Sequence, residues 1–440
     1  MEIILTPLII FLLLAAAFVF SVVSWRWPDI AAAAVIFFAP LYLIKFTVWR
    51  VPLTVLELLL LSFILACLAN KIFKRVGVKK QKAAWLNFTE KKNFWLSVAV
   101  MLLGAFLATA FSENLRVSAG ILKSWILEPL IFAVLAVEAL DGQRTAKWLL
   151  GGALVSGAAV AAVSLGYLIC GRLTFDGRLA AFYLSPNHLA MFLAPALLLA
   201  AGFLFDAKKR WQKSFLLVVA CLLLVILYFT YSYGAWLAVF LAGIFAIFLT
   251  WRLKAISGKK LAAIGGLLLV ALALLAFLQL GGEKLANLLR FERSSLQSRL
   301  IIWQAAGRIL SGNWLLGIGP GMFQKYYLDY QRYFPPYLEW AVPQPQNLFL
   351  AWWLQAGILG LAGFVWLLVG FFQKTWAAVK KQKTSKSKAL EGAAPIIILM
   401  AVVFYLLAHG LIDATYWKND LALVFWVVIA LGYRADRLAG

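Results

Sequence analysis

Residues 394–415 read APIIILMAVVFYLLAHGLIDAT, and segments of this kind decide the fold. The histidine and the carboxylate of this stretch, His409 and Asp413, both occur near the end. An apolar run of this length can cross a hydrocarbon core of about 30 Å. Because backbone in lipid must satisfy its own hydrogen bonds, the run predicts a helix and not an open strand.

Comparable runs recur along the whole chain. Its 440 residues are 64% hydrophobic and 13% charged, with a mean hydropathy of +0.90. This composition is typical of membrane proteins. We therefore predict one all-α, polytopic membrane domain over 1–440, with about 12–13 transmembrane helices and one long extracytoplasmic loop at 281–346 that contains a surface helix. The first span has no basic leader or small-residue cleavage site, so it is expected to be a retained helix. The predicted spans are 3–23, 30–48, 52–70, 94–111, 118–140, 147–170, 188–205, 213–230, 234–250, 262–280, 347–373, 394–415 and 419–435.

The net charge of +23 follows the predicted topology. Basic side chains crowd the connections at 71–92, 208–213, 252–260 and 374–388. These are every second connection, as the positive-inside rule requires of cytoplasmic loops. Attraction to anionic lipid headgroups accounts for them, so no nucleic-acid partner is expected.

The metal-binding residue types are too sparse for the common metal sites. Cys67, Cys170 and Cys221 show no ligand spacing, and His188 and His409 are the only histidines. A disulfide framework and a multi-histidine site are therefore excluded, whereas an ion held by carboxylates is not. No cofactor is expected.

With the basic loops inside, every unusual polar motif falls on or beside an outer connection, which suggests one site at the outer membrane face. The outer connections are Ser112–Val117, Gly171–Asn187, Tyr231–Tyr233, Gly281–Gln346 and Tyr416–Lys418.

Two arginines stand out in these connections. Arg178 lies in the loop that ends at Ser185-Pro186-Asn187, a sequence typical of a helix start. It can bind phosphate or snorkel to lipid headgroups. Arg299 lies in 294–311, whose spacing predicts a surface helix with Trp303 on the same face. The expected apolar stripe of that helix is Leu296, Leu300, Trp303, Gly307 and Leu310.

Other motifs leave alternatives open. Gly317-x-Gly319-Pro320-Gly321 favours a tight turn over a backbone anion nest. Ionisable residues inside spans are candidates for function, and Glu57, Lys123 and Glu128 qualify. Lys123 and Glu128 are five apart, about 140° around an α-helix, so each is expected to find a partner on another helix or in a water-filled cavity. His409 and Asp413 are four apart and favour a structural hydrogen bond.

Together these pieces resemble the O-antigen ligase family of membrane glycosyltransferases, which includes O-antigen polymerases and protein O-oligosaccharyltransferases. The likeness runs from about the fifth span onward. Its residues are Trp125–Leu130, Arg178 with Ser185–Asn187, Thr230–Trp236, Arg299 with Trp303, Gly317, Gly319 and Gly321, Asn347–Leu350 followed by Gly357–Gly360, and His409–Asp413.

The resemblance implies transfer of a glycan from a polyprenyl pyrophosphate carrier, of the undecaprenyl type, to a glycan, lipid or protein acceptor. The expected place is the outer face of a bacterial cytoplasmic membrane, in assembly of surface polysaccharide. Fixed guanidinium groups can stabilise the pyrophosphate leaving group without a metal. Arg299 is the first choice for that role and Arg178 the second. The remaining substrate-binding candidates are Asn187, Tyr233, Trp303, Asn347, Asp413 and Glu128.

The chain departs from the family pattern at two positions. Tyr233 stands where the family commonly has Arg, and Gln346 where it commonly has His. A histidine there can act as a base on the acceptor, whereas a glutamine can only orient the acceptor or donate a hydrogen bond to it. Catalytic roles are thus expected for Arg299, Gln346 and His409, with His409 as the substitute base. The alternatives are a transporter or flippase of a lipid-linked sugar, and an inactive glycan-binding assembly subunit.

Overall fold

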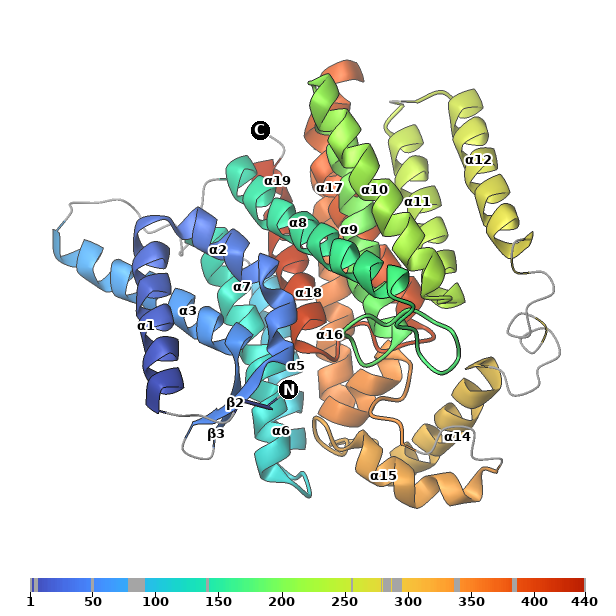
Figure 1. Ribbon diagram of the computed structural model, residues 1–440. Coiled ribbons are helices and arrows are strands. Elements are labelled where there is room, and N and C mark those ends of the chain that lie inside the picture. Colours follow the sequence, from blue (N-terminus) through green and yellow to red (C-terminus); the bar gives the residue numbers. More distant parts are fainter. Residues whose placement is uncertain are drawn as a thin grey trace.

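The computed structural model describes residues 2–3, 7–48, 51–77, 92–139, 142–254, 256–277, 279, 286, 295–335, 341–381 and 386–438. Nearly all of this is helix (Figure 1). Within the described ranges, nine helices are long and apolar enough to cross a membrane. The chain is therefore an all-α, multi-pass membrane protein, as predicted.

The helices follow the predicted spans closely, with shifts of a few residues at their ends. In chain order they are α1 (Pro7–Arg26), α2 (Pro28–Phe37), α3 (Val55–Gly77), α5 (Lys92–Ala110), α6 (Leu115–Ile121), a π-helix (Leu122–Leu127), α7 (Glu128–Ala139), α8 (Gly142–Ile169), α9 (Pro186–Asp206), α10 (Arg210–Phe229), α11 (Tyr233–Arg252), α12 (Gly258–Phe277), α14 (Ser295–Asn313), α15 (Phe323–Tyr330), α16 (Leu348–Lys381), α17 (Lys386–Gly410), α18 (Asn419–Gly432) and α19 (Ala435–Leu438).

The predicted span 30–48 is wrong in its second half. Helix α2 ends at Phe37, a short 3-10 helix covers Ala39–Leu43, and two strands follow, β2 (Lys45–Val48) and β3 (Val51–Thr54). They pair antiparallel, and β1 (Glu2–Ile3) pairs parallel with β2. Pro40 prevents α2 from continuing, and the β-branched residues after it favour a strand. The apolar run is thus divided between a short helix and a hairpin.

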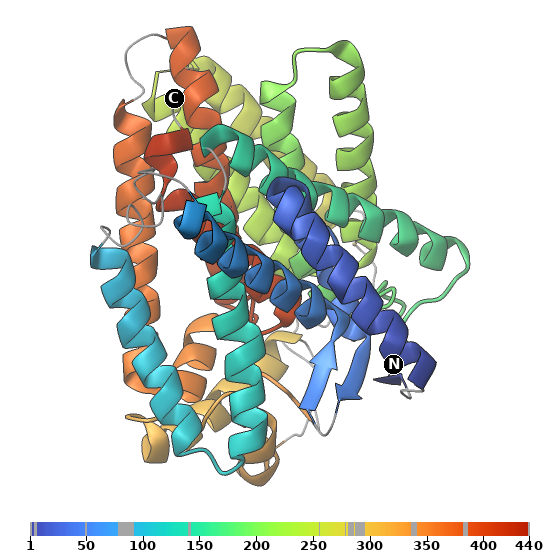
Figure 2. The ribbon, with the colours of Figure 1, turned by 90° about the vertical axis from the view of Figure 1, so that its left-hand side faces the viewer.

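The two ends of the helical bundle differ. One end, called the loop end below, carries the β2–β3 hairpin, the start of α6, and helices α14 and α15 (Figures 1 and 2). The basic connections after α9 and after α11 lie at the opposite end (Figure 1). The predicted outer connection 112–117 and helices α14 and α15 of the predicted 281–346 loop therefore lie at the same end of the bundle.

Glycines fix the loop segment onto the bundle. A Cβ on Gly104 or Gly363 would collide with backbone of the facing helix, so α5 and α16 pack at close range. Gly357 interrupts α16 with φ of 67°, where the Ile358 N–H reaches the Leu315 carbonyl at 3.1 Å. This kink holds the chain that connects α14 to α15 against the bundle.

Candidate functional site

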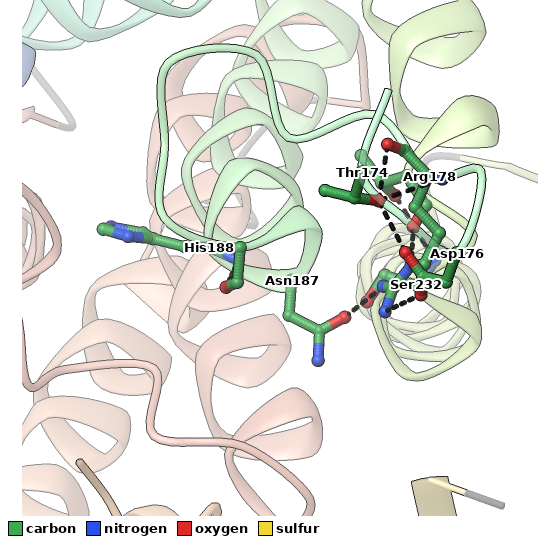
Figure 3. A network of polar contacts seen from close by, with 8 residues as sticks. Thr174, Asp176, Arg178, Asn187, His188 and Ser232 are labelled. Atoms are coloured by element: carbon green, nitrogen blue, oxygen red, sulfur yellow. Dashed lines mark hydrogen bonds and ion pairs between the residues drawn. The ribbon is translucent and has the colours of Figure 1, made fainter. Parts of the chain in front are cut away.

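Arg178 is fixed at the loop end by two neutral acceptors. Its Nε donates to the Thr230 carbonyl at 2.7 Å, and one terminal nitrogen donates to Asn187 Oδ1 at 2.6 Å (Figure 3). The nearest paired carboxylate, Asp176, is 3.9 Å away. Burial lowers the pKa of Arg178, and Asp176 opposes that shift. Its positive charge is held in place without close neutralisation.

The start of α9 provides one of those acceptors. Ser185 caps the helix by accepting from the His188 N–H at 3.2 Å, and Pro186 occupies the first turn. The predicted helix start is therefore confirmed. The cap sends consecutive side chains to opposite sides, with Asn187 toward Arg178 and His188 away from it (Figure 3).

Arg299 is held in the same manner from α14. Its Nε donates to the Ile412 carbonyl and a terminal nitrogen donates to the Ser295 carbonyl at 2.9 Å. The Asp413 carboxylate lies 3.9 Å from the other terminal nitrogen. The side chain is only 10% exposed, so a snorkelling arginine with a solvated head does not describe it.

Trp303 and Asn347 join the surrounding segments to Arg299. Trp303 Nε1 lies 3.4 Å from the Gln346 carbonyl oxygen. Asn347 donates to the Leu411 carbonyl at 2.9 Å and accepts from the Phe349 and Leu350 N–H groups, which caps α16. The predicted spacing of Arg299 and Trp303 on one helix is confirmed, and α14, α16 and the 411–413 turn meet there.

The expected hydrogen bond between His409 and Asp413 is not formed. Helix α17 ends at Gly410, so the two residues no longer share a helical face. His409 Nδ1 pairs with the Tyr405 hydroxyl at 2.9 Å, whereas Asp413 accepts from the Ala414 N–H at 2.8 Å. The buried His409 Nε2 has no hydrogen-bond partner among the described residues.

Tyr233 lies at the first position of α11, on the rim of the same region. Its hydroxyl donates to Gln279 at 3.3 Å, and Gln279 donates to the Tyr228 hydroxyl at 2.9 Å. A Cβ on neighbouring Gly234 would meet His409 at 3.4 Å. Tyr233 and His409 therefore belong to adjoining parts of one region.

Electrostatics connects the two arginines. The charges that act on Arg178 include Arg299, Asp413 and Tyr233. We call Arg178, Asn187, Arg299 and Asp413 the arginine cluster. Gln346, Asn347, Trp303, Tyr233 and His409 surround it through the contacts above. Residues from five separate stretches of the chain thus converge at the loop end.

Glu128 has different neighbours. Its carboxylate lies 3.8 Å from Lys123, which pairs with Glu57 at 2.8 Å. The expectation that Lys123 and Glu128 could not face each other is wrong, because Leu122–Leu127 is a π-helix. A wider turn brings residues five apart onto one side. The expected partner on another helix is confirmed for Lys123, since Glu57 belongs to α3.

Two further expectations need correction or refinement. The buried face of α14 includes Ser298, Ile302, Ala305 and Ile309, whereas Leu300 of the expected stripe is 44% exposed. The glycine motif forms a tight turn with positive φ at Gly317, Gly319 and Gly321. Its Gly321 N–H donates to Gln355 at 2.8 Å. The turn, and not an anion nest, accounts for these glycines.

Backbone strain marks the same region and was missed from the sequence. Among the described residues, Ala181, Tyr231 and Gln346 adopt φ of 52°, 46° and 46° here, and Lys254, after α11, is the other non-glycine residue with positive φ, at 59°. Non-glycine residues seldom hold this conformation, and such residues gather at functional sites. The carbonyls of Thr230 and Ile412 were missed as well, because every residue carries a carbonyl and no sequence pattern marks these two.

A comparison with protein families gives a match to the family described as O-antigen ligase, over residues 217–365. This part of the chain is therefore similar to the O-antigen ligase family. The matched ligase segment runs from α10 into α16 and contains Tyr233, Arg299, Trp303, Gln346 and Asn347. Arg178, Asn187, His409, Asp413 and Glu128 lie outside it. No curated protein matches the chain.

Proposed function

We propose that the protein transfers a glycan from a polyprenyl pyrophosphate carrier to an acceptor hydroxyl at the outer face of the cytoplasmic membrane. The O-antigen ligase match supports ligase- or polymerase-type glycan transfer in general. The arginine cluster supports the finer statement, because two buried guanidinium groups converge at the loop end. The alternation of basic connections supports an outward orientation for that end.

The leaving group defines the chemical demand on the site. Breaking the bond between the sugar and the pyrophosphate leaves negative charge on phosphate oxygens. Arg178 and Arg299 direct their shortest hydrogen bonds to neutral acceptors, while their carboxylate neighbours are both at 3.9 Å. Each guanidinium has five N–H donors, so further donors remain for the pyrophosphate. Fixed donors aimed at developing charge need no reorganisation during the reaction.

In this proposal, His409 takes the proton from the acceptor hydroxyl. We assign that role to Nε2, which is buried and has no hydrogen-bond partner among the described residues, and the Tyr405 hydroxyl orients the ring through Nδ1. Gln346 contributes a hydrogen bond at the same site. The sugar carbon exchanges its bond to the carrier for a bond to the acceptor oxygen, and the carrier leaves as polyprenyl pyrophosphate.

The test uses purified full-length protein in lipid, a polyprenyl-pyrophosphate-linked glycan, and a panel of acceptors. We expect carrier pyrophosphate to be released together with a new glycoside, and both products to be lost in Arg299→Ala. Arg308→Ala is the matched control, because Arg308 is an exposed arginine on the same helix. Transfer that is indifferent to Arg299→Ala would overturn the proposed site.

A second function has a specific basis in the sequence. Tyr233 and Gln346 replace the Arg and His that are common in the family, and this favours a glycan-binding assembly subunit. That function predicts carrier binding without turnover for every acceptor. The transporter alternative has no comparable support, because the polar groups gather at one end and not at mid-depth.

A further inference from the structure

A recess with a largely apolar lining and several charged side chains is bordered by the β2–β3 hairpin, α6 and the π-helix. The hairpin and the start of α6 lie at the loop end (Figures 1 and 2). The volume of the recess is about 920 Å³, which is within the range of ligand sites. We call this recess the hairpin groove. Its lining includes Lys45 and Leu53 of the hairpin, Arg116 and Ile121 of α6, Lys123 of the π-helix, and Asn419 of α18.

Positive charge predominates in the groove lining. Among the described residues that line the groove, Lys45, Arg116 and Lys123 accompany one carboxylate, Glu57. That carboxylate already has two structural partners, because Glu57 Oε2 accepts from the Thr54 N–H at 2.7 Å and Oε1 pairs with Lys123 at 2.8 Å. Lys45 and Arg116 are exposed. Lys418 also lies within electrostatic reach of Lys45.

The groove also has an apolar side, next to the starts of two helices. Helix α3 begins at Val55 and α6 begins at Leu115, so the groove lies at two helix ends. Val117 lines the groove and is 41% exposed, and Leu115, which is outside the lining but next to it in sequence, is 58% exposed. Cations beside exposed apolar side chains at a helix end suit a molecule with an anionic head and a hydrocarbon tail.

We propose that the hairpin groove binds the phosphate headgroup of a lipid, held by Lys45 and Arg116 with the tail along α6. Two lipids share this chemistry, a polyprenyl phosphate and an anionic phospholipid. The groove contacts α18 through Asn419, which accepts from Trp125 at 2.7 Å. The turn that precedes α18 supplies Ile412 and Asp413 to the arginine cluster. The two regions therefore share one connecting segment. This proposal does not depend on glycan transfer.

The experiment is photo-crosslinking of the purified full chain with lipids that carry a photoreactive group beside the phosphate. Separate arms use a polyprenyl phosphate probe and a phosphatidylglycerol probe, each also competed with inorganic phosphate. Crosslinks are mapped by peptide mass spectrometry. We expect them on residues 45–54 and 114–125, reduced at least tenfold in Lys45→Gln/Arg116→Gln and unchanged in the control Arg308→Gln.

Each outcome decides between the possibilities. Labelling by the polyprenyl probe alone supports a carrier site, and labelling by both probes supports a general lipid-phosphate site. Labelling of other peptides in the wild-type protein overturns the proposal, as does undiminished labelling in the double variant. Full competition by millimolar inorganic phosphate would assign the groove to a soluble anion instead. Arg299→Ala, which removes transfer, is expected to leave groove labelling intact, so the two proposals fail separately.

Discussion

The arginine cluster and the hairpin groove lie at the same end of one bundle and hold their cations differently. In the cluster, Arg178 and Arg299 are 14% and 10% exposed, and backbone or amide oxygens orient them. In the groove, Lys45 and Arg116 are exposed. A buried planar guanidinium held in one orientation is suited to stabilising charge in a transition state. Exposed cations on flexible stems are suited to attracting a headgroup. We therefore propose that the cluster carries out the chemistry and that the groove binds lipid.

The carboxylates of the two regions also differ in the groups that they contact. Asp413 lies at the edge of the arginine cluster and accepts a backbone N–H. Glu57 and Glu128 flank Lys123 at 2.8 Å and 3.8 Å, so the ionic contacts of the groove wall are largely internal. Substitutions in the cluster should change transfer, and substitutions in the groove wall should change stability.

The largest effect is expected at Arg299. Arg299→Ala should lower transfer by about 10²–10³-fold, the usual cost of removing one fixed donor to developing charge. Arg299→Lys should restore little of the lost transfer rate, because a lysine cannot donate to the Ile412 carbonyl, the Ser295 carbonyl and a phosphate together. Single-turnover transfer rates measure this, with Arg308→Ala as control. An equal loss of transfer in Arg308→Ala would show that both substitutions act by disturbing α14, and not by removing a donor to the pyrophosphate.

The second-largest effect is expected to be an increase in the transfer rate when Gln346 is replaced by histidine. Gln346→His should raise transfer by about 10²-fold, since position 346 is less buried than His409 and a general base there would be more accessible to the acceptor. Transfer by this variant should increase with pH through about 6.5. The transfer rate is measured as a function of pH for the wild type and the variant, with Gln346→Asn as control. An unchanged rate with an unchanged profile would place Gln346 outside the reacting groups.

A smaller effect is expected at Arg178 and its support. Arg178→Lys should lower transfer by about tenfold, and Asn187→Ala by a few-fold, because Asn187 only orients the guanidinium. The split between kcat and KM for the donor distinguishes the roles. A larger effect for Asn187→Ala than for Arg178→Lys would contradict the assignment.

The groove wall provides a stability test. Glu57→Gln should lower the free energy of unfolding by about 1–3 kcal/mol, because it weakens the α3 cap and the Lys123 pair. Glu128→Gln should change it by less than about 1 kcal/mol, since neither oxygen accepts a hydrogen bond among the described residues. Thermal unfolding in detergent compares the two. Transfer per folded molecule should stay unchanged in both.

The smallest effect concerns the surface pair Glu113–Lys325, which ties the turn before α6 to α15. The hydrogen bond from Lys325 lowers the pKa of Glu113. This contribution to stability is therefore full above the ordinary carboxyl pKa and is lost as pH falls through the lowered value. Glu113→Gln should cost less than about 1 kcal/mol, and the difference from wild type should vanish in acid.

The sequence predicted most of the fold, because apolar length and basic loops depend on local composition. Its failures have local causes. Pro40 and the β-branched residues after it formed a hairpin within an apolar run, and the π-helix changed the angle between Lys123 and Glu128. The end of α17 at Gly410 separated His409 from Asp413.

The candidate site was predictable only in part. Arg178, Asn187, Arg299 and Trp303 were identifiable as unusual polar or aromatic residues in outer connections. Their acceptors on Thr230 and Ile412 were not, because a backbone carbonyl leaves no signal in sequence. The strained φ angles of Tyr231 and Gln346 were hidden for a similar reason, since neither is a glycine.

The most direct test of the central claim is an experimental structure of the protein with a polyprenyl-pyrophosphate-linked glycan bound in lipid. We expect pyrophosphate oxygens about 3 Å from the guanidinium nitrogens of both Arg178 and Arg299, with the first sugar facing His409 and Gln346. Pyrophosphate bound between Lys45 and Arg116, with the arginine cluster unchanged, would contradict it.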